Sequence, residues 1–148
     1  MTNISIYELR IVKEGKEQYE VEEKITSPEI AVKTINEILD LENKAEEEMV
    51  MMTLDTKNKV TGLFRISKGT INASMVHPRE IFKRAMLHNA NSIMLFHNHP
   101  SGDLDPSQED INTTNRLADS GTLLGIKLLD HIIISREGNL SFKAKRLL

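Results

Sequence analysis

The spacing of apolar residues changes early in the chain. Apolar and polar residues alternate over residues 4–12, residues 14–16 are typical of a turn, and alternation resumes over residues 18–23. This pattern predicts strand, turn and strand in an N-terminal extension, which we assign to residues 1–24. Ser27 and Pro28 then indicate the start of a helix, with the serine as its N-cap. The apolar face of this helix comprises Ile30, Ile35, Ile38, Leu39 and Leu41.

Residues 25–148 are expected to form one domain, and its first half contains a hairpin. The continuous apolar run at residues 49–54 predicts a buried strand. Residues 55–59 are typical of a turn, and residues 60–67 supply the antiparallel partner. A short third strand is expected at residues 70–76.

The second half of the domain alternates helices with strands. Pro78 begins a helix, residues 92–96 form a buried strand, and two further strands are expected at residues 125–135 and 139–142. Strands that alternate with helices predict an α/β sandwich. Because two strands form a hairpin, the sheet should be mixed rather than purely parallel.

One more helix is expected between the strands at residues 92–96 and 125–135. Asp105 is its predicted N-cap, with Pro106 at the first helical position. Gln108 completes a capping-box pattern with Asp105, and the helix should continue to about Gly121.

Composition restricts both the class of protein and the chemistry open to it. The chain has 148 residues, 39% of them hydrophobic, and a formal net charge of -3. This length is typical of a single domain. A membrane helix needs about 20 apolar residues in a row, and every apolar run here is far shorter. The first ten residues lack the apolar core of a secretory signal, so we expect a cytoplasmic location and no membrane partner. With no cysteine, a metal site must use His, Asp or Glu.

The richest group of polar residues follows the strand at residues 92–96. His97 and His99 are two apart on an extended segment, so their imidazoles point the same way. Ser107 and Asp110 are three apart on the following helix and share a face. Two His and one carboxylate leave a fourth position for water, which is the layout of a catalytic zinc site.

Other families with a His-x-His pattern do not fit this chain. The HNH nucleases distribute their motif over a ββα unit rather than in adjacent positions. The amidohydrolases need a barrel of about 250 residues, which exceeds this length. The metallo-β-lactamases require an Asp-His pair after the second His, whereas Pro100 and Ser101 follow here.

The order His97-Asn-His99-Pro, then Ser107, then Asp110 resembles the JAMM motif of JAB1/MPN metallopeptidases. Within that superfamily the chain resembles the RadC-like branch over residues 25–142. The blocks that carry this resemblance are residues 54–58 (LDTKN), 69–71 (GTI), 76–82 (VHPREIF), 97–102 (HNHPSG) and 129–134 (LDHIII). The resemblance implies a three-layer αβα sandwich of the cytidine-deaminase type with a hydrolytic zinc site.

The resemblance also implies roles for individual residues. It implies that His97, His99 and Asp110 bind Zn²⁺ and that Ser107 helps to hold the oxyanion. The family places a Glu, as general base, where the first strand of the domain begins. Residues 46–48 are all Glu, and the spacing back from residues 54–55 selects Glu47, with Glu48 as the alternative. The implied reaction is hydrolysis of an amide or isopeptide bond in an unidentified peptide or protein substrate.

Several interpretations stay open beside this one. Full-length RadC relatives carry an N-terminal helix-hairpin-helix region associated with DNA, which residues 1–24 are too few to hold. A DNA role inherited from the family is therefore weaker for this chain. A nucleic-acid-binding protein of DNA repair or of mobile elements is kept as the alternative, although the net charge does not favour it. A metal-free MPN scaffold is a third interpretation.

The pair Asp130 and His131 also has two interpretations. The two residues are either a polar pair at a strand end or a support for the metal ligands. The pattern indicates no particular oligomeric state.

Overall fold

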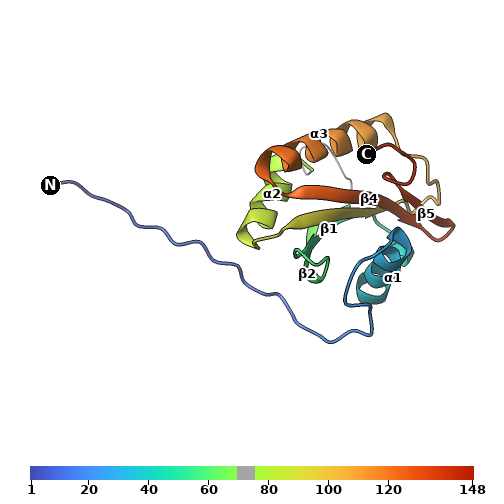
Figure 1. Cartoon of the computed structure of the whole chain (residues 1–148), viewed down its shortest axis with the longest axis horizontal. Coiled ribbons are helices and arrows are strands. Elements are labelled where there is room, and N and C mark those ends of the chain that lie inside the picture. The colour runs from blue at the N-terminus through green and yellow to red at the C-terminus, as the bar shows by residue number, and fades with distance from the viewer. Residues whose placement is uncertain (70–75) are drawn as a thin grey trace.

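Five strands form one mixed sheet in the computed structural model, which describes residues 1–69 and 76–148 (Figure 1). The order across the sheet is β2-β1-β3-β4-β5. The strands are β1 (Glu48–Leu54), β2 (Val60–Lys68), β3 (Ser92–Asn98), β4 (Lys127–Ser135) and β5 (Gly138–Ser141). Only β3 and β4 are parallel, and the other neighbours are antiparallel. The mixed sheet predicted from the hairpin is confirmed.

Helices cover both faces of this sheet, which confirms the predicted αβα sandwich. Helix α1 (Pro28–Leu39) and the 3-10 turn η1 (Leu41–Asn43) lie on one face, and helices α2 (Pro78–Leu87) and α3 (Gln108–Leu124) lie on the other (Figure 1). None of the helices in the described part of the chain has the length and apolar character that crossing a membrane requires.

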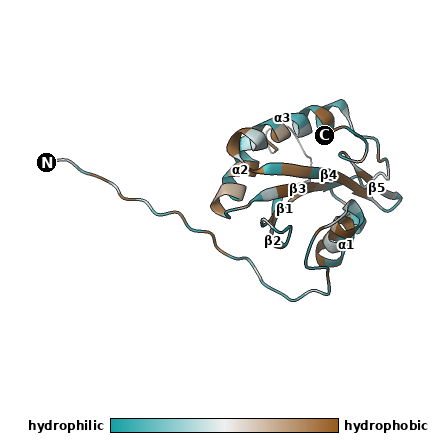
Figure 2. Ribbon diagram, viewed as in Figure 1, coloured by the Kyte–Doolittle hydropathy of each residue, from teal (hydrophilic) through white to brown (hydrophobic). Residues whose placement is uncertain are grey.

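Two separate hydrophobic clusters join the layers, because successive strand residues point to opposite faces. Every residue of β1 and β3 is buried, and Figure 2 shows hydrophobic colouring along the central strands. The cluster under α1 includes Ile35, Val50, Met52, Phe96 and Ile132. The cluster under α2 and α3 includes Met51, Phe82, Leu95, Leu117 and Leu128. His97 therefore faces α3, whereas its neighbour Asn98 faces α1.

The starts of α1 and α2 follow the local sequence. Ser27 is the N-cap of α1, and its Oγ accepts a hydrogen bond from the Ile30 N–H at 3.3 Å. Pro28 and Pro78 occupy the first positions of their helices, where a missing N–H has no cost. Both predicted helix starts are confirmed.

Helix α3 starts two residues later than predicted. Ser107, not Asp105, is its N-cap, because Ser107 and Asp110 cap each other. Ser107 Oγ accepts the Asp110 N–H at 2.9 Å, and Asp110 Oδ2 accepts the Ser107 N–H at 2.9 Å. This reciprocal pair satisfies two backbone N–H groups at the start of the helix. The capping box predicted between Asp105 and Gln108 does not form. The helix ends at Leu124, beyond the expected Gly121.

The N-terminal extension also differs from the prediction. Residues 1–23 form no strand and leave the domain as an extended, exposed segment (Figure 1). Pairing begins at Lys24, which forms an antiparallel bridge with Lys59. An isolated two-stranded hairpin is marginally stable in water, and this segment has no sheet surface beneath it. The strand expected at residues 70–76 lies, apart from Val76, outside the described residues.

Asn98, the last residue of β3, fastens the segment that precedes β1. Its Oδ1 accepts the Glu48 N–H at 2.7 Å. Its Nδ2 donates to the backbone oxygens of Glu46 at 2.9 Å and Lys44 at 3.3 Å. The three bonds hold residues 44–48 against the end of β3, next to His97.

We expect Asn98→Ala to lower the free energy of unfolding by roughly 1–3 kcal/mol, because it leaves buried backbone groups without partners. Urea denaturation followed by circular dichroism measures the change. Asn112→Ala, on the exposed face of α3, is the matched control and should stay within about 0.5 kcal/mol of wild type. Equal stabilities of the two variants would contradict this role of Asn98.

Gly121, near the end of α3, lies against the backbone of Ile126. A Cβ at this position would lie 2.4 Å from the backbone oxygen of Ile126. Gly121→Ala should therefore lower the free energy of unfolding by roughly 1–3 kcal/mol, although Gly→Ala inside a helix is normally stabilising. Thermal denaturation tests this, with Gly15→Ala as control, since no atom lies within 4 Å of a Cβ there. A raised melting temperature for Gly121→Ala would refute the steric argument.

Candidate metal centre

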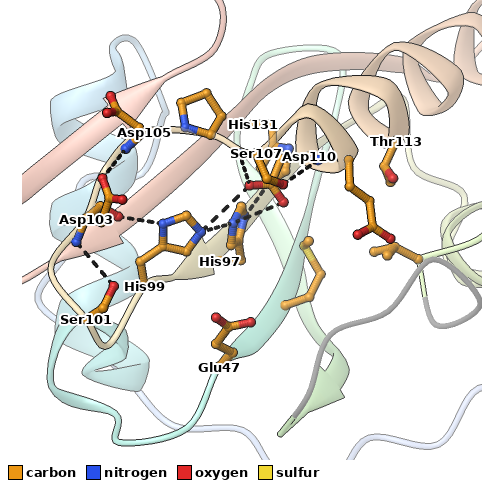
Figure 3. Close-up of a pocket in the computed structure, with 14 residues that line it drawn as sticks. Glu47, His97, His99, Ser101, Asp103, Asp105, Ser107, Asp110, Thr113 and His131 are labelled. Carbon is orange, nitrogen blue, oxygen red and sulfur yellow. Dashed lines mark hydrogen bonds and ion pairs between the residues drawn. The ribbon is translucent and has the colours of Figure 1, made fainter.

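Three side chains that the sequence singles out converge above the end of β3. His97 Nε2 lies 2.9 Å from His99 Nε2 and 3.9 Å from Asp110 Oδ1 (Figure 3). His99 Nε2 lies 3.8 Å from Asp110 Oδ2. The two imidazoles come from β3 and the residue that follows it, and the carboxylate comes from the first turn of α3. Reciprocal capping with Ser107 holds that carboxylate in place.

The spacing of these atoms suits a small divalent cation. In a tetrahedral zinc site with bonds of about 2.0–2.1 Å, neighbouring ligand atoms lie about 3.3 Å apart. The two imidazole nitrogens are closer together than that, and the nearest carboxylate oxygens are farther away. One ligand atom from each of the three residues lies within 4.8 Å of the other two. Two imidazole nitrogens and a carboxylate oxygen suit zinc and other first-row divalent ions.

The protonation of the imidazoles also fits a metal site. His99 Nδ1 lies 2.6 Å from the backbone oxygen of Asp103, and a carbonyl can only accept, so Nδ1 carries the proton. The other ring nitrogen of His99, Nε2, faces His97 and Asp110. Burial lowers the pKa of His97 to about 4, although the Asp110 carboxylate acts in the opposite direction. His97 is consequently neutral at physiological pH, as metal binding requires.

A pocket of about 520 Å³ opens over the three ligands. Glu47 and Ser107 both line it, and Figure 3 shows Glu47 across the pocket from Ser107 and Asp110. Ser107 Oγ accepts the Asp110 N–H, so its own hydroxyl proton is available for another acceptor. Ser107 is thus both a helix cap and part of the pocket wall.

The neighbouring glutamates point to opposite faces of the sheet. Glu47 is half-buried and lines the pocket together with Met49. Glu48 is 3% exposed and faces α1, where Arg65 Nε lies 3.2 Å from its Oε1. Strand alternation therefore brings Glu47, and not Glu48, to the metal ligands.

The same alternation separates Asp130 from His131. His131 faces α3, where its Nε2 lies 2.6 Å from His97 Nδ1. Asp130 faces away and accepts hydrogen bonds from the Ser141 hydroxyl and the Lys143 N–H. Of the two interpretations of this pair, His131 fits the support for a metal ligand and Asp130 fits the polar pair.

Thr114 is the residue near the site that sequence reasoning missed. Its Oγ1 lies 2.7 Å from His131 Nδ1 and donates to the backbone oxygen of Asp110. Its position four residues after Asp110 on one helix face was the available signal.

The imidazole of His131 is neutral, like that of His97. Burial lowers the pKa of His131 well below its usual value.

Comparison with known proteins finds relatives in several bacteria. A UPF0758 protein of Desulfitobacterium hafniense (strain DSM 10664 / DCB-2) is 44% identical over 132 residues, which cover 84% of this chain and 58% of the relative. The UPF0758 protein TTE0897 of Caldanaerobacter subterraneus subsp. tengcongensis is 46% identical over 121 residues, covering 82% and 51%. The UPF0758 protein SAB1521c of Staphylococcus aureus (strain bovine RF122 / ET3-1) is 54% identical over 112 residues, covering 75% and 48%. The chain thus spans about half the length of these relatives.

The family model of the RadC-like JAB domain matches residues 25–147. This match includes all five strands, all three α-helices and the three converging ligands. It confirms the resemblance seen in the sequence blocks. The chain therefore belongs to the RadC-like JAB domain family.

Proposed function

We propose that this protein is a zinc-dependent hydrolase that cleaves an amide or isopeptide bond in a peptide or protein. The observation that carries the proposal is the convergence of His97, His99 and Asp110 in a pocket that also presents Glu47. Zinc held by these ligands would polarise the substrate carbonyl and lower the pKa of water to roughly 7. The remaining chemistry belongs to side chains of the chain itself.

Glu47 is the general base in this proposal. Its carboxylate shares the pocket with the ligands, where it can take a proton from the attacking water. The same carboxyl group can then deliver that proton to the leaving amine nitrogen. A positioned acid–base group of this kind contributes typically ~10²–10⁴-fold to the rate.

Ser107 stabilises the negative charge that develops on the carbonyl oxygen of the substrate. Its hydroxyl proton is available because Ser107 Oγ accepts its bond from the backbone. The cap fixes the oxygen on the pocket wall before substrate binds. One donor of this type accounts for roughly 10²–10³-fold in turnover where it has been removed from other hydrolases.

The charge of the pocket supports a peptide substrate over a nucleic acid. Carboxylates from Asp103, Asp105 and Glu109 line it in addition to those of Glu47 and Asp110. Its described lining residues include no Lys or Arg, which are the side chains that neutralise phosphates. A phosphodiester backbone would therefore meet repulsion on approach.

The proposed function predicts the metal content of the protein. Native protein should contain close to one zinc per chain by mass spectrometry, and the double variant His97→Ala/His99→Ala should contain almost none. His77→Ala is the matched control, because His77 caps α2 and does not line the pocket. Absence of zinc from wild type, even after reconstitution at neutral pH, would refute the proposed hydrolase.

The second prediction separates the two adjacent glutamates. Glu47→Gln should keep its zinc and lose at least about 100-fold in turnover of a panel of fluorogenic peptide and isopeptide substrates, because the general base is gone. Glu48→Gln should keep both zinc and turnover, although it loses the ion pair with Arg65. The reverse result would assign the base to Glu48.

A DNA-binding measurement tests the alternative function. Steeply salt-dependent binding of duplex DNA without peptide cleavage would favour the nucleic-acid alternative.

A further inference from the structure

A continuous chain of hydrogen bonds runs beneath the metal ligands and links two of them. It starts at the backbone oxygen of Asp110, which lies 2.7 Å from Thr114 Oγ1. It continues from Thr114 Oγ1 to His131 Nδ1 at 2.7 Å, and from His131 Nε2 to His97 Nδ1 at 2.6 Å. The two ends of this series of hydrogen bonds, Asp110 and His97, are therefore residues of the candidate metal centre. Thr114 and His131, in between, are not candidate metal ligands.

The first link determines the direction of every later one. The Asp110 carbonyl can only accept, so the single hydroxyl proton of Thr114 is used in that bond. Thr114 Oγ1 must then accept from His131, which places a proton on His131 Nδ1. Burial of His131 favours the uncharged imidazole, which has no proton on Nε2 once Nδ1 carries one, so Nε2 accepts from His97 Nδ1–H.

The consequence for His97 is a single tautomer. With its proton on Nδ1, His97 presents a bare Nε2 to the pocket. His99 turns its Nε2 toward the same point, because its Nδ1 donates to the Asp103 carbonyl. The Nε2 atoms of the two rings lie 2.9 Å apart beside the Asp110 carboxylate. A cation bound among the three groups would take its bonds from these atoms.

Burial makes the chain of bonds difficult to replace. Thr114, His131 and His97 are 0%, 2% and 2% exposed, so water has little access to their polar atoms. The ring of Phe142 stacks on His131 with centroids 4.6 Å apart and an angle of 16° between the planes. This contact holds the imidazole in the plane that its two hydrogen bonds require.

We propose that Thr114 and His131 are positioning residues that fix the tautomer and orientation of His97 as a metal ligand. The proposal rests on the metal centre of the proposed function and extends it to two residues outside the motif. Partners of this kind behind a metal-binding His typically change metal affinity by ~10–100-fold when they are removed.

The test uses Thr114→Val, which removes the hydroxyl at nearly constant volume, and Thr114→Ser, which keeps it. Zinc affinity is measured by competition with a chromogenic chelator on the full chain. We expect Thr114→Val to bind zinc ~10–100-fold more weakly than wild type and Thr114→Ser to stay within about threefold. Thr122→Val is the matched control, since Thr122 makes the same hydroxyl-to-carbonyl bond, to Ala118, on the exposed part of α3.

A second readout does not need metal. In the zinc-free protein, ¹⁵N NMR of the imidazoles should show His97 protonated on Nδ1 in wild type and in Thr114→Ser. In Thr114→Val the same ring should show a mixture of tautomers. His131→Phe, which keeps a ring against Phe142 and removes both nitrogens, should shift the His97 tautomer in the same direction.

The two readouts separate the possible failures. If wild type binds no zinc, the proposed function fails, and the tautomer of His97 still supports or refutes the chain of bonds. If wild type binds zinc and Thr114→Val binds it equally well with an unchanged tautomer, the positioning role is refuted. A loss of zinc affinity in Thr122→Val equal to that in Thr114→Val would also overturn it.

Discussion

The burial of two polar side chains at the end of the central strand β3 is the constraint on which the rest of the molecule depends. His97 and Asn98 are 2% and 1% exposed, and they point to opposite faces of the sheet. A buried polar group without a partner costs roughly 1–3 kcal/mol, so each face must supply partners. The face under α1 supplies residues 44–48 to Asn98, and the face under α3 supplies His131 to His97. Satisfying these two side chains also positions Glu47 and the candidate metal ligands.

Helix α3 combines a structural role with a chemical one in its first turn. Asp110 caps the helix through one carboxylate oxygen and the Ser107 N–H, and its other oxygen faces His97. A negative charge near a helix N-terminus is favourable, so the cap and the ligand require the same group in the same place. The spacing of Ser107 and Asp110 in the motif is thus also the spacing of a capping box. For this reason the N-cap of the helix is Ser107 and not Asp105.

The local sequence predicted the elements whose ends depend on neighbouring residues. Ser27 with Pro28, and Pro78, locate two helix starts through capping and the missing N–H of proline. The apolar run at residues 49–54 locates strand β1. The two strands expected within residues 1–23 do not form, because alternation shows only that a segment could pair. Pairing also needs a partner strand and a surface to cover, and neither is a property of the segment.

By itself the sequence determined the fold class, the family and the set of three candidate ligands, because these depend on periodicity and on a motif with short spacing. The sequence favoured Glu47 with Glu48 as the alternative, and only the tertiary structure decided that Glu47 lines the pocket, since that depends on the register of β1 against its neighbours. The tertiary structure also brings His131, Thr114 and His97 into one series of hydrogen bonds. These residues come from β4, α3 and β3, and hydrogen bonds between them exist only once the layers have packed. Local spacing cannot specify such contacts, because their geometry is set by elements far apart in the chain.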